Sequence, residues 1–301
     1  MPAEPELPRP ATGIDESTPR FVDTPEGCVA WHEAGEGDPP LVLLHGFSGH
    51  RDDFIGVLPA LGQRRRVLAP DLRGHGDSEA GPGKLAWSFE QLVNDFLAFL
   101  DALELDRIDL LGHSVGGFVA LRAALVAPER FRSLVFLCTA PETPGRMDPK
   151  GWQAGCAISA ERGMDGFQPL AERAMRNEPF PGLAAWGDPE RYYAHHRRRH
   201  ASMTPESYLG VGATFFESLS IADRLPELAH PILVLVGEQD LDWLPGADLF
   251  EHHLPTATRI TVPDAEHHPH QENRDAFLEA LEAHLERVAR TTDHQDQRGT
   301  R

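Results

Sequence analysis

The sequence predicts an α/β fold, a doubly wound and mostly parallel sheet, and two observations lead to this prediction. Short apolar runs alternate with helical patterns along most of the chain. The runs are continuous rather than alternating, which is typical of parallel strands that helices cover on both faces. With 301 residues, the chain is long enough for one large domain that carries an inserted subdomain.

Each apolar run predicts one strand. The runs are Leu41–Leu44, Val67–Ala69, Ile108–Leu111, Leu134–Leu137, Ile232–Val236 and Ile260–Val262. The stretch from Cys28 to His32 alternates more weakly, and it predicts an antiparallel edge strand.

Two amphipathic helices are clear in the pattern. Apolar side chains from Phe89 to Leu103 recur on one helical face, and Ser88 with Gln91 forms a capping-box pattern before it. A second helix is predicted over Phe277 to Val288. Strands and helices that alternate in this way place functional residues at the carboxyl ends of the strands.

One long segment breaks the alternation. Residues 141–229 contain helical patches punctuated by Pro, Gly, Trp and Met, and they predict a helical cap. The core domain is then residues 20–140 plus 230–290. Residues 1–19 and 291–301 lack an apolar period, and we expect them to be disordered tails.

The composition limits the partners. The 28 Lys and Arg residues against 47 Asp and Glu residues give a net charge of −19. Such a surface repels phosphate backbones and anionic membranes, so we expect no nucleic-acid partner and no membrane partner. No signal peptide or membrane span is visible, which favours a cytoplasmic protein acting on a small molecule as a monomer or homodimer.

Cysteine and histidine spacings predict neither a disulfide framework nor a metal site. The three cysteines are Cys28, Cys138 and Cys156, an odd number at wide spacing. A metal-binding interpretation of His267, His268 and His270 lacks the matching carboxylate or cysteine spacing. We therefore expect no metal and no cofactor.

The most informative motif is Gly112-His113-Ser114-Val115-Gly116, which lies between a predicted strand and a predicted helix. This is the context of a nucleophile elbow, in which a serine sits on a strained turn. Glycine lacks the Cβ atom that would clash there. A helix that begins just after Ser114 offers free N–H groups to the serine oxygen. The alternative is a glycine-rich turn with an idle serine.

Candidate partners for this serine follow in order. Asp240 comes just after the run that ends at Val236, and His267 comes after the last predicted strand. The order Ser114, Asp240, His267 is the chain order of a triad on this type of sheet. The turn after Leu44 aims the N–H of Phe47 inward, and Val115 would supply a second donor for an oxyanion hole.

Together, these motifs resemble those of the α/β-hydrolase superfamily over about Val22 to Val288. The segments that carry the resemblance are His45–Phe47, Asp71–Ser78, Gly112–Gly117, Gly237–Asp240 and Glu266–Glu272. The resemblance implies a mostly parallel eight-stranded sheet with an inserted helical cap. It also implies Ser114 as nucleophile, His267 as base, Asp240 as acid, and Phe47 and Val115 as the oxyanion hole. The Asp71–Ser78 loop would brace the site.

Two departures from the family pattern concern the base. Glu266 stands where the family usually has glycine, so its carboxylate either raises the pKa of the base or points to solvent. His268 is a second candidate base, although the spacing to Glu272 favours His267. Glu142 and Asp242 compete with Asp240 as the acid, and Asp240 is preferred.

The identity of the nucleophile limits the reactions that the protein is expected to catalyse. A serine at position 114, rather than Asp or Cys, disfavours relatives that attack with a carboxylate or a thiolate. Acyl transfer to water predicts a serine hydrolase that cleaves a carboxylic ester. Alternatives are an enol-lactonase or carbon–carbon bond hydrolase of aromatic degradation, a perhydrolase side activity, and a non-catalytic ligand receptor on the same fold.

The substrate pocket is the least determined part. Trp152, Trp186 and Phe215 are candidate lining residues in the cap. The basic run from His195 to His200 either draws an anionic substrate toward the cap or forms a solvated helix face paired with acidic neighbours. The solvated face is the preferred interpretation.

Overall fold

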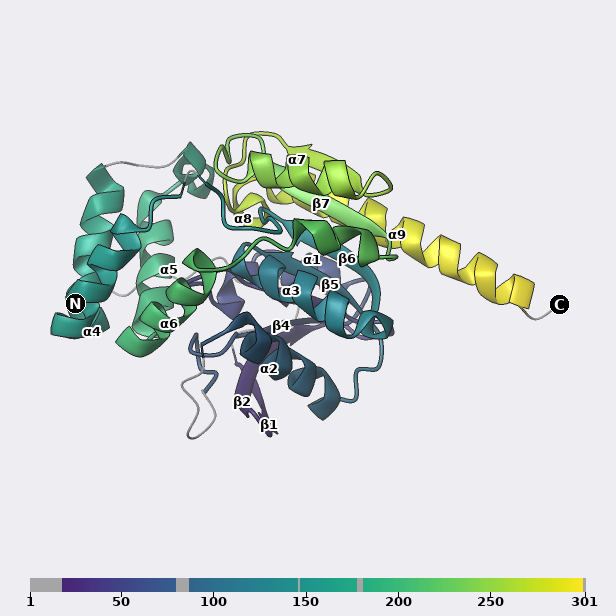
Figure 1. Cartoon of the computed structure of the whole chain (residues 1–301), viewed down its shortest axis with the longest axis horizontal. Coiled ribbons are helices and arrows are strands. Elements are labelled where there is room, and N and C mark those ends of the chain that lie inside the picture. Colours follow the sequence, from purple (N-terminus) through teal and green to yellow (C-terminus); the bar gives the residue numbers. More distant parts are fainter. Residues whose placement is uncertain (1–17, 80–86, 146, 178–180, 300–301) are drawn as a thin grey trace.

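The computed structural model describes residues 18–79, 87–145, 147–177 and 181–299 (Figure 1). Eight strands form one sheet in the order β1-β2-β4-β3-β5-β6-β7-β8. The strands are β1 (Arg20–Thr24), β2 (Gly27–Ala34), β3 (Leu41–Leu44), β4 (Val67–Pro70), β5 (Ile108–His113), β6 (Phe131–Leu137), β7 (Ile232–Gly237) and β8 (Thr258–Val262). Strand β2 pairs antiparallel with β1 and β4, and the other pairs are parallel. The predicted mostly parallel sheet is confirmed.

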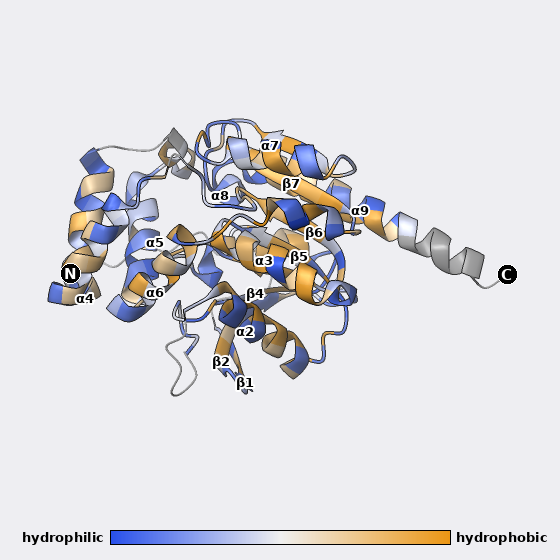
Figure 2. Cartoon of the chain, viewed as in Figure 1, coloured by the Kyte–Doolittle hydropathy of each residue, from blue (hydrophilic) through white to orange (hydrophobic). Residues whose placement is uncertain are grey.

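Burial explains why the central strands are continuous apolar runs. Every residue of β3, β5 and β7 is buried, because helices cover both faces of the sheet. In Figure 2 the labelled strand β7 is coloured as hydrophobic. The run from Cys28 to His32 lies in β2, which is not the edge strand, since β1 adds outside it. The pattern of β1 is weak because most of its residues, Phe21 included, are exposed.

The helices of the core domain lie on the two faces of the sheet. The α-helices are α1 (Leu58–Gly62), α2 (Phe89–Ala102), α3 (Val115–Val126), α4 (Lys150–Asn177), α5 (Pro189–Ala201), α6 (Pro205–Phe216), α7 (Leu244–His253), α8 (Pro269–Glu272) and α9 (Arg274–Gly299). Short 3₁₀ helices are η1 (Arg51–Phe54), η2 (Pro128–Arg130), η3 (Pro181–Trp186) and η4 (Ala222–Glu227). Helices α2, α3 and α7 share one apolar core with the sheet, and α1 and α9 share the other.

The start of α2 agrees with its sequence pattern. The Gln91 N–H donates to Ser88 Oγ at 3.1 Å, which satisfies one of the free donors of the first turn. Phe89, Leu92 and Phe96 are buried on the face that packs against the sheet and α3. The predicted helix is therefore present over the expected residues.

The segment between β6 and β7, residues 141–229, is here called the insertion. Its described residues form α4, α5 and α6 with two 3₁₀ helices and contain no strand. Helix α4 packs against both α5 and α6, and the three helices gather at one end of the sheet (Figure 1). Gly163, at φ 70°, interrupts α4 and divides it into two helical pieces.

The C-terminal helix is longer than the sequence suggests. Helix α9 continues to Gly299, whereas a disordered tail was expected from residue 291 (Figure 1). A helix that is already nucleated and packed extends by one backbone hydrogen bond per added residue and needs no apolar face to do so. The N-terminal tail expected over residues 1–19 lies almost wholly outside the described residues. Among the described helices, none combines the length and apolar character needed to cross a membrane.

Candidate active site

Ser114 lies between the end of β5 and the first residue of α3, at the carboxyl edge of the sheet. Its backbone has φ 52° and ψ −121°, a conformation that costs a non-glycine residue energy. Neighbouring groups hold it there. The Ser114 N–H donates to the Leu137 carbonyl at 3.0 Å, and the Thr139 hydroxyl donates to the Ser114 carbonyl at 2.7 Å.

The glycines beside this serine allow close backbone packing. A Cβ atom on Gly116 would lie 2.5 Å from the main-chain oxygens of Leu44 and His45. A Cβ atom on Gly112 would lie 2.4 Å from the Gly116 oxygen. The turn from β5 into α3 therefore needs glycine at both positions, which agrees with the sequence argument.

Asp240 and His267 come from loops at the carboxyl ends of β7 and β8. His267 Nδ1 lies 2.9 Å from Asp240 Oδ2, and the Asp240 carboxylate is buried. The His267 side chain is 25 % exposed, and the Trp243 ring stacks on it at 5.3 Å. Because Nδ1 faces Asp240, Nε2 is the nitrogen left to face the cavities that His267 shares with Ser114.

Two buried groups hold the loop that carries His267. The Glu272 carboxylate accepts the N–H groups of Glu266 and His268, on either side of His267. His113 Nε2 lies 2.7 Å from the His267 carbonyl oxygen. Burial raises the pKa of Glu272 to about 7, and the nearby Glu266 carboxylate adds to the rise. The loop is thus fixed from α8 and from the residue before Ser114.

The alternative candidates for the base and the acid do not form a pair like that of His267 and Asp240. The His268 Nδ1 atom lies 3.9 Å from a Glu272 carboxylate oxygen, and burial and the His113 ring lower the pKa of His268 well below its usual value. Asp242 is exposed, and Glu142 has no contact with His267 among the described residues. Glu266 is half-buried, and its pKa is raised by burial and by the Asp240 charge. The geometry pairs His267 with Asp240 alone.

The two expected oxyanion donors are both unengaged. Neither the Phe47 N–H nor the Val115 N–H has a hydrogen-bond acceptor within the described part of the chain. Phe47 and Val115 both line a cavity that Ser114 also lines. The loop before Phe47 approaches closely, since a Cβ atom on Gly46 would lie 3.0 Å from the Ser114 Cβ. Two free donors beside a serine are suited to stabilising an oxyanion.

Two cavities of similar size meet at Ser114. The first, about 210 Å³, is here called the apolar lobe. Its lining comprises Phe47, Ser114, Val115, Met147, Trp152, Tyr208, Phe215, Phe216, Trp243 and His267. The second, about 220 Å³, is here called the polar lobe. Its lining comprises Gly46, Phe47, Ser48, His113, Ser114, Tyr192, His196, Arg199, His267 and His268.

Two of the three pocket candidates from the sequence line one of these cavities. Trp152 and Phe215 line the apolar lobe, whereas Trp186 lines neither lobe and packs against Tyr192 and His195. Tyr208 was missed, although it stands seven residues before Phe215 on α6, a spacing that places both on one helical face. No short-range signal identifies Trp243, because it enters the lobe from the core.

Among the residues that the structure describes, one group of side chains lies close enough together to hold a metal ion. Ligand atoms of Cys138, Asp240 and His267 lie within 4.8 Å of one another. Asp240 and His267 already bond each other, and burial and the Asp240 charge raise the pKa of the Cys138 thiol well above its usual value. A protonated thiol is a poor metal ligand. These three groups are therefore better explained as one hydrogen-bonded cluster.

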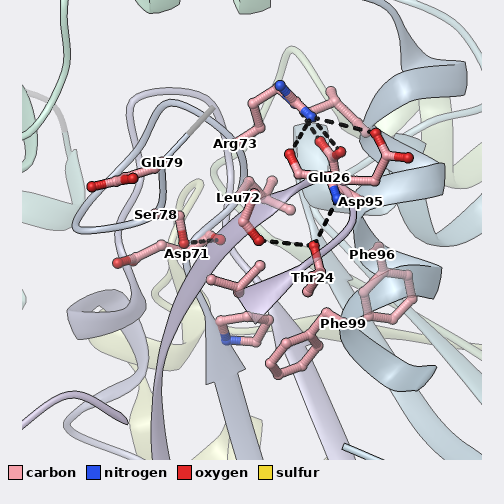
Figure 3. A pocket seen from close by; sticks show the side chains of 14 residues that line it. Thr24, Glu26, Asp71, Leu72, Arg73, Ser78, Glu79, Asp95, Phe96 and Phe99 are labelled. Carbon is pink, nitrogen blue, oxygen red and sulfur yellow. Dashed lines mark hydrogen bonds and ion pairs between the residues drawn. The ribbon is translucent and has the colours of Figure 1, made fainter. Parts of the chain in front are cut away.

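A separate hollow lies between β1, β2 and α2, away from Ser114 (Figure 3). Arg73 projects over it and pairs with Asp95 and the Glu26 carbonyl. The space is only about 30 Å³, room for little more than water, and substrate sites are roughly ten times larger. Its ion pair joins the Asp71–Ser78 loop to α2, which is a structural task.

The fold agrees with comparison to known proteins. A family model described as the alpha/beta hydrolase fold matches residues 39–273. The chain belongs to this family. Its sheet, with one antiparallel end and parallel strands elsewhere, is the architecture that the sequence predicted.

The named relatives include esterases and the acetyltransferase component of an acetoin cleaving system. The pimeloyl-[acyl-carrier protein] methyl ester esterase of Methylococcus capsulatus is 36% identical over 211 residues, 69% of this chain and 78% of that protein. The dihydrolipoyllysine-residue acetyltransferase component of the acetoin cleaving system of Pseudomonas putida is 42% identical over 123 residues, 40% of this chain. The chain covers only 33% of that protein. A thermophilic esterase from Thermogutta terrifontis, solved with malate bound, superposes with a TM-score of 0.76 at 25% identity, covering 90% of this chain and 99% of that one.

Proposed function

We propose that the protein is a serine hydrolase that cleaves a carboxylic ester through an acyl-enzyme. The observation that carries the proposal is the convergence of three elements at one cavity: the strained Ser114, the hydrogen-bonded His267–Asp240 pair, and the free N–H groups of Phe47 and Val115. Relatives named as esterases support the same reaction class.

In this proposal, His267 Nε2 takes the proton of the Ser114 hydroxyl as its oxygen attacks the ester carbonyl. The Phe47 and Val115 N–H groups then donate to the negative oxygen of the tetrahedral intermediate. His267 returns the proton to the alcohol oxygen as the ester C–O bond breaks. Water, deprotonated by the same nitrogen, releases the acid and restores Ser114. Asp240 holds the tautomer of His267 in which Nδ1 carries its proton.

The insertion supplies eight of the 17 residues that line the two lobes. Trp152, Tyr208 and Phe215 wall the apolar lobe, and Arg199 and His196 wall the polar lobe. We therefore assign residues 141–229 as a cap that encloses the substrate over the core of residues 20–140 and 230–290. Neither a metal ion nor a cofactor takes part in the proposed reaction.

The test is a p-nitrophenyl ester series, from acetate to decanoate, on the wild type and Ser114→Ala. We expect wild-type turnover to peak at one chain length and Ser114→Ala to lose several orders of magnitude in kcat. Ser220→Ala, an exposed serine, is the matched control and should keep full activity. Circular dichroism establishes that each variant is folded.

Three results would overturn the proposal. Retention of most activity in Ser114→Ala would remove the serine from the mechanism. Turnover of an enol-lactone or a dienone acid, with none of any ester, would instead select the lactonase or the carbon–carbon bond hydrolase. Tight binding of a ligand without turnover would select a receptor.

A further inference from the structure

The two lobes that meet at Ser114 differ in charge. Aromatic and aliphatic side chains dominate the apolar lobe. The polar lobe holds one permanent cation, Arg199 of α5, and its described lining includes no carboxylate. Arg199 is only 5 % exposed, although the protein as a whole is strongly acidic and could pair it at the surface. A buried cation in a small cavity requires an explanation.

Contacts on one side fix the Arg199 guanidinium. Its Nε donates to the Ser48 carbonyl oxygen at 2.7 Å and lies 3.6 Å from Asp53 Oδ1. The Asp53 side chain is fully buried, and it also contacts His195 Nε2 at 2.7 Å and the His50 N–H at 3.2 Å. The Arg199 side chain is therefore held at Nε and cannot swing freely into solvent.

The other side of the guanidinium is unpartnered. Across the part of the chain that the structure describes, neither terminal nitrogen of Arg199 donates a hydrogen bond. Since Nε is turned toward Ser48 and the residue lines the polar lobe, these two nitrogens are the ones left for the lobe. Two parallel N–H donors in a plane match the two oxygens of a carboxylate.

The neighbouring imidazoles do not add competing charge. Burial, His200 and Arg199 lower the pKa of His196 to about 2. Burial and His113 lower the pKa of His268 well below its usual value. Both rings are thus neutral at pH 7, and each retains an N–H for donation. Arg199 is then the charge that an incoming group meets in this lobe.

We propose that the polar lobe is an anion subsite, in which Arg199 binds a carboxylate of the substrate while the apolar lobe holds a hydrocarbon arm. This inference rests on the proposed ester hydrolysis and names its substrate class. The substrates are esters with a carboxylate on one side of the scissile bond and an apolar group on the other. The reacting carbonyl lies between the lobes, at Ser114.

Matched ester pairs test the subsite from each side of the scissile bond. For the acyl side, the pair is p-nitrophenyl hexanoate and mono-p-nitrophenyl adipate, which differ only in a terminal methyl or carboxylate. For the alcohol side, the pair is phenyl hexanoate and 4-carboxyphenyl hexanoate. We expect one pair to show a kcat/KM about 10- to 100-fold higher for the anionic member, a size typical of a desolvated charge-assisted pair.

Three variants test whether Arg199 causes the preference for the anionic ester. Arg199→Gln should abolish the preference for the anionic ester, and the kcat/KM ratio of the anionic to the neutral ester is the readout, because loss of the bond to Ser48 affects kcat for both esters alike. Arg199→Lys keeps the charge but not the planar fork, so it should retain part of the preference. Arg197→Gln is the control for net charge, because Arg197 pairs with Glu172 outside both lobes. It should behave as the wild type.

Different results would overturn the anion subsite and the proposed ester hydrolysis. Ester turnover with no anionic preference in either pair, or an equal loss for both members in Arg199→Gln, would overturn the subsite and leave the esterase intact. If no ester is turned over, calorimetry with 4-phenylbutyrate and its neutral amide still decides. Tighter binding of the carboxylate that Arg199→Gln abolishes supports the subsite, and equal binding of the two overturns it.

Discussion

His113 Nε2 lies 2.7 Å from the main-chain oxygen of His267, and the two rings lie 4.8 Å apart. Burial lowers the pKa of His113 well below its usual value, with the His267 ring as a second cause, so the His113 ring is neutral and its N–H donates. The residue next to the serine thereby holds the loop that carries the proposed base. A shift of His113 would therefore also shift the loop that carries His267.

Replacing His113 with Leu should therefore impair both stability and catalysis. The His267 carbonyl would lose its buried donor, which costs roughly 1–3 kcal/mol of unfolding free energy. We expect kcat to fall about 10-fold with little change in KM, because a shifted base affects the reaction more than binding. His113→Gln, which can still donate, should recover part of the loss. An unchanged kcat in the Leu variant would contradict this coupling.

Asp240→Asn tests the assignment of the acid. An amide turned toward His267 Nδ1 favours the wrong tautomer, and we expect kcat to fall by roughly 10⁴-fold at neutral pH. Asp242→Asn changes an exposed neighbour and should retain wild-type activity. Steady-state kinetics on one activated ester suffices for both. A large loss in the Asp242 variant, or a small one in the Asp240 variant, would reverse the assignment.

Gly116→Ala tests the packing of the turn after Ser114. The new Cβ atom would lie 2.5 Å from two main-chain oxygens that belong to the end of β3 and the residue after it, so the backbone must move. We expect urea unfolding to show a loss of at least about 2 kcal/mol, in the range of overpacked cores. Gly56→Ala is the control, since nothing lies within 4 Å of its Cβ position. Equal stability of the two variants would refute the argument.

Glu272 should give the protein a specific pH dependence of stability. Its pKa is raised by burial from 4.5 to about 7. Between these pH values the unfolded chain has lost the proton that the folded protein keeps, so unfolding becomes easier as the pH rises. The loss is complete above pH 7 and amounts to about 3 kcal/mol.

The comparison with Glu272→Gln isolates this contribution, because Gln does not titrate. The difference in unfolding free energy, wild type minus variant, should decrease by about 3 kcal/mol from pH 4.5 to pH 8. Urea denaturation at several pH values measures it. A difference that stays constant, or that grows with pH, would show that the carboxyl is not buried in this way.

The sequence was most informative where local chemistry is decisive. The continuous run Leu41–Leu44 and the glycines around Ser114 each have one good structural solution, a buried parallel strand and a strained turn. The pairing of Asp240 with His267 followed from their places after successive strands. Periodicity and motif order therefore predicted the sheet and the hydrogen-bonded pair of Asp240 and His267.

The pocket depended on tertiary packing, which a single sequence does not show. Arg199 stands in a basic run with Arg197 and Arg198, and nothing local separates the three. The structure buries Arg199 beside Ser48, while Arg197 and Arg198 remain partly exposed. The preferred interpretation of a solvated helix face holds for the two exposed arginines and is wrong for Arg199, and it is also wrong for His195, His196 and His200, which are buried. The difference lies in which helical face meets the core.

The bond from Arg199 Nε to the Ser48 carbonyl joins α5 to the loop that carries the Phe47 N–H. Lifting α5 to admit a bulky molecule has to break this bond, and the loop then loses one of its restraints. The position of the Phe47 N–H therefore depends on where α5 lies, although α5 itself contributes no donor to the oxyanion hole.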